Sequence, residues 1–167
     1  MTDLTDSDKE KIILLTDKAL NLLSFRPRTC HEMKGKLVQE AVKKGITLDK
    51  VEIVIESLKE KRFLSDEDFA RWWIDQRETF RPKGERAIKI ELRQKGLDQE
   101  IINAVLEERK ETGKNDFELA LSLAQKKIGR LSNLPLKERK EKIIGILQRR
   151  GFDWETVSAV IANIFEK

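Results

Sequence analysis

Cysteine, proline and long apolar runs are nearly absent from this chain of 167 residues. The one cysteine, Cys30, excludes a disulfide framework. No apolar run approaches the ~18 residues that a membrane span needs. Charged residues on both sides of the short apolar run near the start exclude a secretory signal. The lone thiol and the missing export signal therefore predict a cytoplasmic protein with no membrane partner.

The chemical groups that most enzymes need are also scarce. Neither G-x-x-x-x-G-K-[ST] nor G-x-G-x-x-G occurs, so no glycine-rich loop is available to cradle a phosphate. Because His31 is the single histidine, a two-histidine zinc motif is excluded. The side chain of its neighbour Cys30 points in a different direction on a helix, so the two are poorly placed to bind one metal ion. The carboxylates Asp66, Glu67 and Asp68 are interpreted as helix-start residues that interact with the helix dipole. We expect no metal, no cofactor and no enzymatic activity.

The chain is rich in charge and in helix-forming residues. It has 34 Lys and Arg and 30 Asp and Glu, which gives a net charge of +4. Leu, Ile, Lys, Glu and Ala, which favour helices, dominate. Apolar residues recur at helical spacing, as at Ile101, Ile102, Val105 and Leu106. No segment alternates convincingly between apolar and polar residues, so the predicted fold class is all-α.

Three segments of the sequence repeat one another. They are KKGITLDKVEIVIESL, QKGLDQEIINAVLEER and RRGFDWETVSAVIANI, and they align on Gly45, Gly96 and Gly151. Each glycine fits the left-handed position that ends a helix, and the cations before it oppose the negative end of the helix dipole. Two residues later each copy has a side chain that caps the next helix. These caps are Thr47, Asp98 and Asp153.

A further helix precedes each of these helix pairs, which makes the repeating unit three helices, present three times. We predict repeats at residues 18–64, 65–112 and 113–167. Residues 1–17 form an extension that is part of the first helix or precedes it. The matching positions are Ala19, Leu22, Leu23 and Arg26 in the first repeat, Ala70, Trp73, Ile74 and Arg77 in the second, and Ala120, Leu123, Ala124 and Lys127 in the third.

Two local features concern the second helix of the first repeat. Thr29 with Glu32 matches a capping box at its start. Leu37 precedes Gly45 by eight residues, whereas the corresponding leucines of the other repeats precede their glycines by four. We therefore predict that this helix is one turn longer.

Basic residues gather in the middle of the chain. Residues 71–96 contain eight cations and four acids. A helix that begins near Gly84 would place Arg86, Lys89 and Arg93 on one face, at steps of three and four residues. Such a stripe can neutralise phosphates. A solvated helix face is the alternative, since charge runs usually are solvated.

Two adjacent tryptophans, Trp72 and Trp73, point to different sides of a helix. Trp73 aligns with Leu22 and Leu123, which predicts a core position. Trp72 has polar residues at its repeat positions, so it contacts either the neighbouring repeat or a partner.

The chain resembles the RecX family, whose members modulate the bacterial recombinase RecA. The segments that carry the resemblance are ALNLLSFRPRTCHEM, SLKEKRFLSDEDFARWW and RPKGERAIKIELRQKGLDQEIINAVL. The resemblance implies tandem three-helix repeats in an elongated, curved array. It also implies a non-enzymatic regulator of DNA recombination and repair. Such a regulator lies in the groove of the RecA–DNA filament, inhibits or disassembles the filament, and lowers ATP hydrolysis and strand exchange.

The predicted contact surface combines Trp72 with basic residues of the second repeat and extends into the third. The expected partner is the RecA filament, with contact to single- or double-stranded DNA left open, and the chain is expected to be a monomer. The candidate residues are Arg71, Trp72, Arg77, Arg81, Lys83, Arg86, Lys89, Arg93, Lys95, Lys126, Lys127, Arg130, Arg149 and Arg150.

Two other functions stay open. Two helices around a glycine turn also describe a helix-turn-helix, so a protein that binds DNA directly is the main alternative. The acids at the start of each third helix, Asp49, Glu100 and Glu155, count against it, because a groove-reading helix rarely turns carboxylates toward phosphate. A helical adaptor for some other protein would leave a recombinase unaffected.

Overall fold

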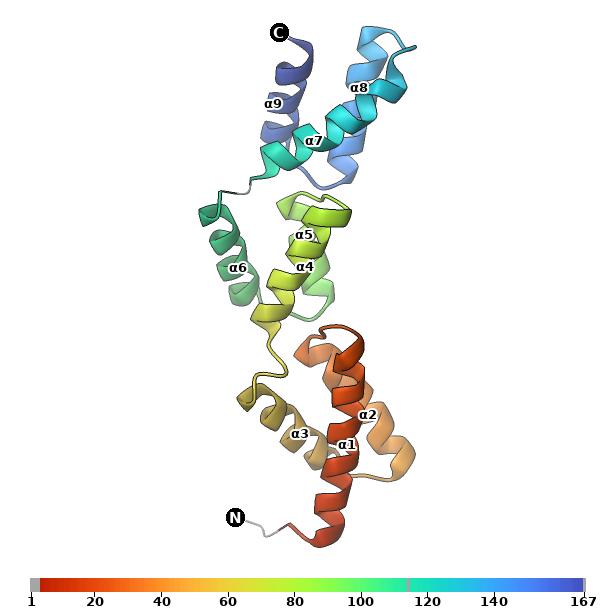
Figure 1. Cartoon of the computed structure of the whole chain (residues 1–167), viewed down its shortest axis with the longest axis vertical. Helices are drawn as coiled ribbons and strands as arrows, with labels where there is room; N and C mark the ends of the chain where they lie inside the picture. Colours follow the sequence, from red (N-terminus) through yellow and green to blue (C-terminus); the bar gives the residue numbers. More distant parts are fainter. Residues whose placement is uncertain (1–3, 114, 167) are drawn as a thin grey trace. The chain divides into compact units, whose positions relative to one another are not determined.

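The computed structural model describes residues 4–113 and 115–166, and in this part of the chain all regular structure is helical (Figure 1). The predicted all-α fold class is confirmed. The elements are α1 (Asp6–Phe25), α2 (Cys30–Lys44), α3 (Leu48–Glu60), α4 (Asp66–Phe80), α5 (Glu85–Gln94), α6 (Gln99–Glu111), α7 (Asp116–Ile128), the 3₁₀ turn η1 (Gly129–Leu131), α8 (Leu136–Arg149) and α9 (Trp154–Phe165).

The helices follow one another in groups of three, which we call the first repeat (α1–α3), the second repeat (α4–α6) and the third repeat (α7–α9). In the first repeat α1, α2 and α3 pack on one another around Leu15 and Leu37. In the third repeat α7, α8 and α9 do the same around Leu147. The predicted core positions nine residues after each aligned glycine are all buried; they are Val54, Val105 and Val160.

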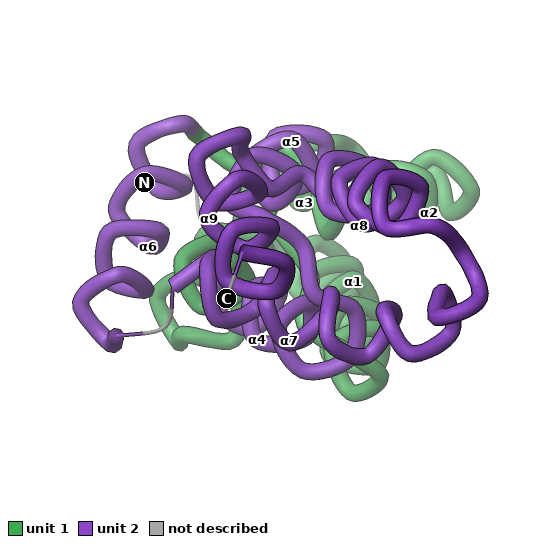
Figure 2. The backbone as a smooth tube through the Cα atoms, turned by 90° about the horizontal axis from the view of Figure 1, so that it is seen from above, with its two compact units in different colours: residues 1–70, 95–98 green, residues 71–94, 99–167 purple. Residues whose placement is uncertain are grey.

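The chain divides into two compact units (Figure 2). Unit 1 comprises residues 1–70 and 95–98, and unit 2 comprises residues 71–94 and 99–167. Helix α1 is continuous from Asp6. The repeat boundaries at 17/18, 64/65 and 112/113 stay predictions, as does the elongated, curved form of the array, and the outer limits at residues 1 and 167 lie outside the described residues.

The three aligned glycines take the backbone conformation that their position after a helix requires. Gly45, Gly96 and Gly151 have φ angles of 63°, 84° and 83°. This is the left-handed region, which residues with a Cβ atom adopt at a cost. The prediction of a glycine turn between the second and third helix of each repeat is confirmed.

The predicted caps of the third helices are confirmed at one position and wrong at another. The carboxylate of Asp153 accepts a hydrogen bond of 2.8 Å from the amide of Thr156. Thr47 stands at the N-cap of α3, but its side chain accepts no cap hydrogen bond. The nearby Thr47 side chain is instead the leading cause that lowers the pKa of the Asp49 carboxyl.

The start of α2 follows the prediction only in part. Thr29 Oγ1 accepts a hydrogen bond of 3.0 Å from the amide of Glu32, as a cap should. The return half of the capping box is missing, because the Glu32 carboxylate binds the guanidinium groups of Arg26 and Arg28. The prediction of a helix one turn longer is confirmed against α5, since α2 has 15 residues and α5 has 10. It is wrong against α8, which has 14 residues because it begins earlier relative to its core leucine.

Long-range hydrogen bonds within unit 1 connect the start of α2 to the beginning of α4 and to the turn before α6; we call this group the first joint. The amide of Cys30 donates to Oδ1 of Asp66 at 2.7 Å. The hydroxyl of Thr29 donates to the carbonyl of Lys95 at 2.9 Å. Asp66 therefore satisfies a free amide at the start of another helix, which agrees with a structural role for this carboxylate.

The same arrangement recurs within unit 2, at the start of α5; we call it the second joint. The amide of Glu85 donates to Oδ2 of Asp116 at 2.8 Å. The amide of Gly84 donates to the carbonyl of Arg150 at 2.9 Å. In both joints the first residue of a repeat's first helix caps the second helix of the preceding repeat, so the repetition extends beyond local sequence to the contacts between repeats.

The second joint leaves no room for a side chain at Gly84. A Cβ atom there would lie 2.6 Å from the amide nitrogen of Phe152 and closer still to the carbonyl of Gly151. Because these atoms belong to backbone, they cannot rotate away. We expect Gly84→Ala to lower the free energy of unfolding by about 1–3 kcal/mol, measured by urea denaturation.

Gly35, inside α2, supplies the matched control. A Cβ atom at that position would meet nothing within 4 Å. Gly35→Ala should therefore raise the free energy of unfolding by about 0.5–1 kcal/mol, because alanine favours the helix. Equal effects of the two substitutions would contradict the close approach at the second joint.

Candidate partner-binding surface

Some of the predicted basic residues are held by carboxylates within the second repeat. Arg71 on α4 donates two hydrogen bonds, of 2.9 and 3.0 Å, to the carboxylate of Glu108 on α6. Lys89 Nζ lies 2.8 Å from Oε1 of Glu85, one turn earlier on α5. Arg71 thus ties two helices together, and Lys89 offers less uncompensated charge to a partner than its place on the predicted stripe suggests.

Glu91 on α5 gathers three further donors. Its carboxylate accepts from Trp73 Nε1 at 2.8 Å, from Arg77 Nε at 2.9 Å and from Lys83 Nζ. Burial alone would raise the pKa of Glu91, but the hydrogen bonds from Lys83, Arg77 and Trp73 outweigh it and lower the pKa below its usual 4.5. Arg77 and Lys83, both predicted as partner contacts, therefore hold α4 and the α4–α5 connection against α5.

The two tryptophans differ from the expectation in one respect. Trp73 is half-buried and not fully in the core, because its indole N–H reaches Glu91 and the guanidinium of Arg77 lies 4.5 Å from the centre of its ring. The buried side chain of this turn is Ile74. Trp72 is also half-buried, with its ring centroid 6.0 Å from that of Trp73. Contact of Trp72 with a partner stays a prediction.

Three cations of the second repeat have no carboxylate partner among the described residues. Arg81 and Arg86 are exposed, and exposed Arg93 donates from Nε to the side-chain oxygen of Gln99 at 2.6 Å. Lys95 is half-buried and belongs to the segment of unit 1 that forms the first joint. The predicted surface of the second repeat therefore reduces to Arg81, Arg86 and Arg93 as the charges that are most available.

The candidates of the third repeat are less engaged. Lys126, Lys127, Arg130 and Arg149 lie on α7, η1 and α8, and no ion pair involves them among residues 4–113 and 115–166. Arg150 is different, because it donates from Nη1 to the carbonyl of Pro82 at 3.5 Å in the second joint. Four of these five candidates thus leave their charge to solvent or to a partner.

Counting both signs of charge within each repeat shows where the positive excess lies. Residues 65–112 contain ten basic residues (Lys and Arg) and twelve acidic residues (Asp and Glu). Residues 113–167 contain eleven basic residues and seven acidic residues. The prediction placed the centre of the surface in the second repeat because Arg86, Lys89 and Arg93 share one helix face there. The charge of the third repeat makes it the stronger candidate for contact with an anionic surface.

A cavity of about 580 Å³ lies beside the second joint. Its walls include Arg86 and Lys89 of α5, Lys110 of α6, and Asp116 and Asp153 at the starts of α7 and α9. The cavity confirms that the face of α5 with Arg86 and Lys89 is open to solvent. The acidic residues opposite them keep this cavity from being a purely cationic site.

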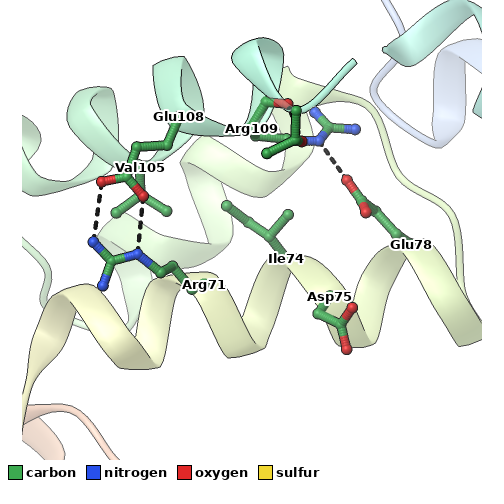
Figure 3. Close-up of a pocket in the computed structure, with 8 residues that line it drawn as sticks. Arg71, Ile74, Asp75, Glu78, Val105, Glu108 and Arg109 are labelled. Atoms are coloured by element: carbon green, nitrogen blue, oxygen red, sulfur yellow. Dashed lines mark hydrogen bonds and ion pairs between the residues drawn. The ribbon is translucent and has the colours of Figure 1, made fainter. Parts of the chain in front are cut away.

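A smaller hollow of about 220 Å³ lies between α4 and α6 (Figure 3). Ile74 and Val105 point toward each other across its apolar floor, and an arginine–carboxylate pair bridges the two helices at each end. The sequence patterns did not reveal this hollow, because its walls come from helices more than 25 residues apart. The bridging pairs are Arg71 with Glu108 and Arg109 with Glu78.

The described residues offer little chemistry beyond binding. Among them, no group of three His, Cys, Asp or Glu side chains is placed to hold a metal ion. No helix in the described ranges has the length and apolar character of a membrane span. Burial, together with the nearby Asp66 carboxylate, raises the pKa of the Cys30 thiol to about 11, so this thiol is protonated at neutral pH and is a poor nucleophile.

Three-helix repeats with equivalent joints define the molecule as an α-helical repeat protein. The family model described as the third three-helix domain of RecX matches residues 115–161, and the model described as the second matches residues 65–106. These two matches coincide with the third and second repeats.

Curated relatives extend the match over most of the chain. The regulatory protein RecX of Chlorobium limicola is 32% identical over 148 residues, which cover 89% of this chain and 87% of that protein. The regulatory protein RecX of Mycolicibacterium smegmatis is 32% identical over 154 residues, which cover 89% of this chain and 80% of that protein. The crystal structure of RecX from Lactobacillus salivarius shares the fold, with a TM-score of 0.81 at 24% identity over 95% of this chain and 99% of that chain. The chain belongs to the RecX family of regulatory proteins, so the resemblance seen in the sequence is confirmed.

The carboxylate of Glu91 makes the stability of the second repeat depend on pH. Its pKa is lower in the folded chain than the usual 4.5, so the stabilisation is present above pH 4.5 and is lost as the pH falls through the folded value. We expect Glu91→Gln to lower the free energy of unfolding at pH 7 by about 1–2 kcal/mol. The difference from the wild type should shrink below pH 4.5, as measured by urea denaturation from pH 3 to 7.

Glu10→Gln, which neutralises an exposed carboxylate of α1, serves as the control and should follow the wild-type profile. A Glu91→Gln variant that is as stable as the wild type at pH 7 would contradict this prediction. It would show that the negative charge of Glu91 does not stabilise the fold through its three hydrogen-bond donors.

Proposed function

We propose that this chain regulates the RecA recombinase by binding in the groove of the RecA–DNA filament, where it inhibits or disassembles the filament without catalysing a reaction. The observation that carries the proposal is the family relationship, which covers 89% of the chain. The relatives are named regulatory proteins, and the described side chains form no constellation of nucleophile, base and metal ligand that would suggest catalysis.

The repeat construction fits an extended protein target. The first and third repeats each have an apolar core, and equivalent joints connect one repeat to the next. A polymer such as a recombinase filament presents the same surface many times. Several weak contacts that are linked in one chain bind such a target far more tightly than any one of them alone.

The distribution of charge supports an anionic counterpart. The exposed cations without carboxylate partners, among them Arg86 and Arg93 in the second repeat and Arg130 and Arg149 in the third, raise the local positive potential. Acidic protein surface or DNA phosphate in the filament groove would complement them and would speed the encounter.

We further propose that the chain acts as a cytoplasmic monomer.

The direct test measures ATP hydrolysis by the cognate recombinase on single-stranded DNA with and without the chain. We expect hydrolysis to fall when the chain is present at well below one molecule per recombinase subunit, because one bound chain blocks extension of a whole filament. Unchanged hydrolysis and unchanged filaments in electron micrographs at excess chain would contradict the proposal and would favour an adaptor for another protein.

Arg86→Ala with Arg93→Ala tests the exposed basic surface. Neither side chain has a carboxylate partner within the described residues, so the free energy of unfolding should change by less than about 0.5 kcal/mol. We expect the concentration for half-inhibition of the recombinase to rise about tenfold, which corresponds to ~1.4 kcal/mol of binding. Unaltered inhibition would remove both residues from the contact surface.

The matched control is Lys36→Ala with Lys43→Ala, two exposed cations of α2 outside the candidate set. This variant removes the same net charge, so it separates a local contact from a general effect of charge. Its half-inhibition should stay within twofold of the wild type.

A salt titration with naked DNA distinguishes the alternative of a direct DNA-binding protein. A tight, sequence-selective complex that weakens steeply with salt would favour the alternative. The exposed acids Asp49, Glu100 and Glu155 at the starts of α3, α6 and α9 disfavour it, because they would face the phosphates of a groove that these helices entered.

A further inference from the structure

Arg109, near the end of α6, is a buried charge at a place where the other repeats have apolar side chains. Its side chain is only 6% exposed. Leu58 and Ile164 occupy the same position, 13 residues after the aligned glycine, in the first and third repeats. A buried guanidinium in place of an aliphatic side chain is costly unless carboxylates compensate it.

Two carboxylates from different helices compensate Arg109. Its Nε donates to Oε1 of Glu78 on α4 at 2.5 Å, and Glu78 is 7% exposed. Its Nη2 lies 3.0 Å from Oδ1 of Asp116, the first residue of α7. Arg109 therefore connects both outer helices of the second repeat to the third repeat, all within unit 2.

Asp116 is also the residue that forms the second joint. Its other oxygen, Oδ2, accepts a hydrogen bond from the amide of Glu85 at the start of α5. The Arg109 guanidinium thus lies against the same carboxylate that caps α5, in a buried ion pair without a hydrogen bond. In the first joint Asp66 caps α2 in the same way, but the position of Arg109 is occupied by Leu58.

We infer that Arg109 is a positioning residue, which holds the third repeat in register on the second so that both can engage one filament. A buried ion pair adds little to stability over an apolar pair of the same volume, but it has a narrow geometry. The role at the filament depends on the proposed function, because linked repeats gain from one another only when their spacing matches the target.

The test uses the full chain with Glu78→Gln and Arg109→Met together, so that both charges of the closest ion pair are removed at once. Hydrogen exchange of the amides of Gly84 and Glu85 reports the second joint, since both donate across it. We expect these two amides to exchange at least tenfold faster than in the wild type. The amides of Cys30, in the first joint, and Leu92, in the core of α5, should keep their rates.

Two exchange results would overturn the inference. Unchanged rates at Gly84 and Glu85 would show that Arg109 does not hold the joint. An equal increase at Leu92 would show that the residue only stabilises the fold of the second repeat. Asp116→Asn, which keeps an oxygen for the Glu85 amide but removes the charge facing Arg109, should give the same pattern more weakly. Lys9→Met, which breaks the exposed pair with Asp6, should leave all rates unchanged.

Inhibition of the recombinase supplies a second readout. The Glu78→Gln, Arg109→Met variant should need at least tenfold more chain for half-inhibition, with its thermal midpoint above the assay temperature. Wild-type inhibition by a variant with fast exchange would overturn the positioning role. If the wild-type chain itself has no effect on the recombinase, the proposed function fails, while the exchange rates still decide whether Arg109 holds the joint.

Discussion

The same hydrogen bond connects the repeats at both joints. The aspartate at the start of one repeat accepts a hydrogen bond from the first backbone amide of the second helix in the preceding repeat. Asp66 accepts from the amide of Cys30, and Asp116 accepts from the amide of Glu85. An amide at a helix start has no partner within its own helix, and a carboxylate at that point also interacts favourably with the helix dipole. Since the donor is backbone and the acceptor is a short side chain, the bond restricts the distance between the two helix starts that it joins. In the second joint a glycine turn lies so close to Gly84 that a Cβ atom is excluded there.

The sequence predicted what depends on nearby residues. Glycines with positive φ, the cap at Asp153 and the buried valines after each glycine were all expected, because helix ends and periodic burial are encoded within about ten residues. The joints could not be predicted in this way. Asp66 was assigned to the start of its own helix, and its actual partner, the amide of Cys30, lies 36 residues earlier. Only the arrangement of the helices brings the two together.

The same limit explains the basic residues. A stripe of cations along α5 is visible in the sequence, but the carboxylates that neutralise some of them come from other helices, as with Arg71 and Glu108, or are shared by several donors, as with Glu91. Charge in the second repeat mainly connects helices, while the third repeat has unpaired cations and few acids. The second repeat therefore uses its charge to hold helices together, while the third repeat leaves positive charge exposed.

The first and third repeats differ from the middle one at the positions that form the joints. In the first two repeats the second helix begins seven residues before the leucine at its core, Leu37 or Leu92, and the free amide there receives the next carboxylate. Helix α8 begins eleven residues before the corresponding Leu147, so the equivalent residue, Lys140, lies inside the helix with its amide already paired. Helix α1 likewise begins more than two turns before the position that corresponds to the starts of α4 and α7. At that position α4 and α7 have Asp66 and Asp116, whereas α1 has the buried Leu15. Neither position therefore offers the group that forms the two joints described above.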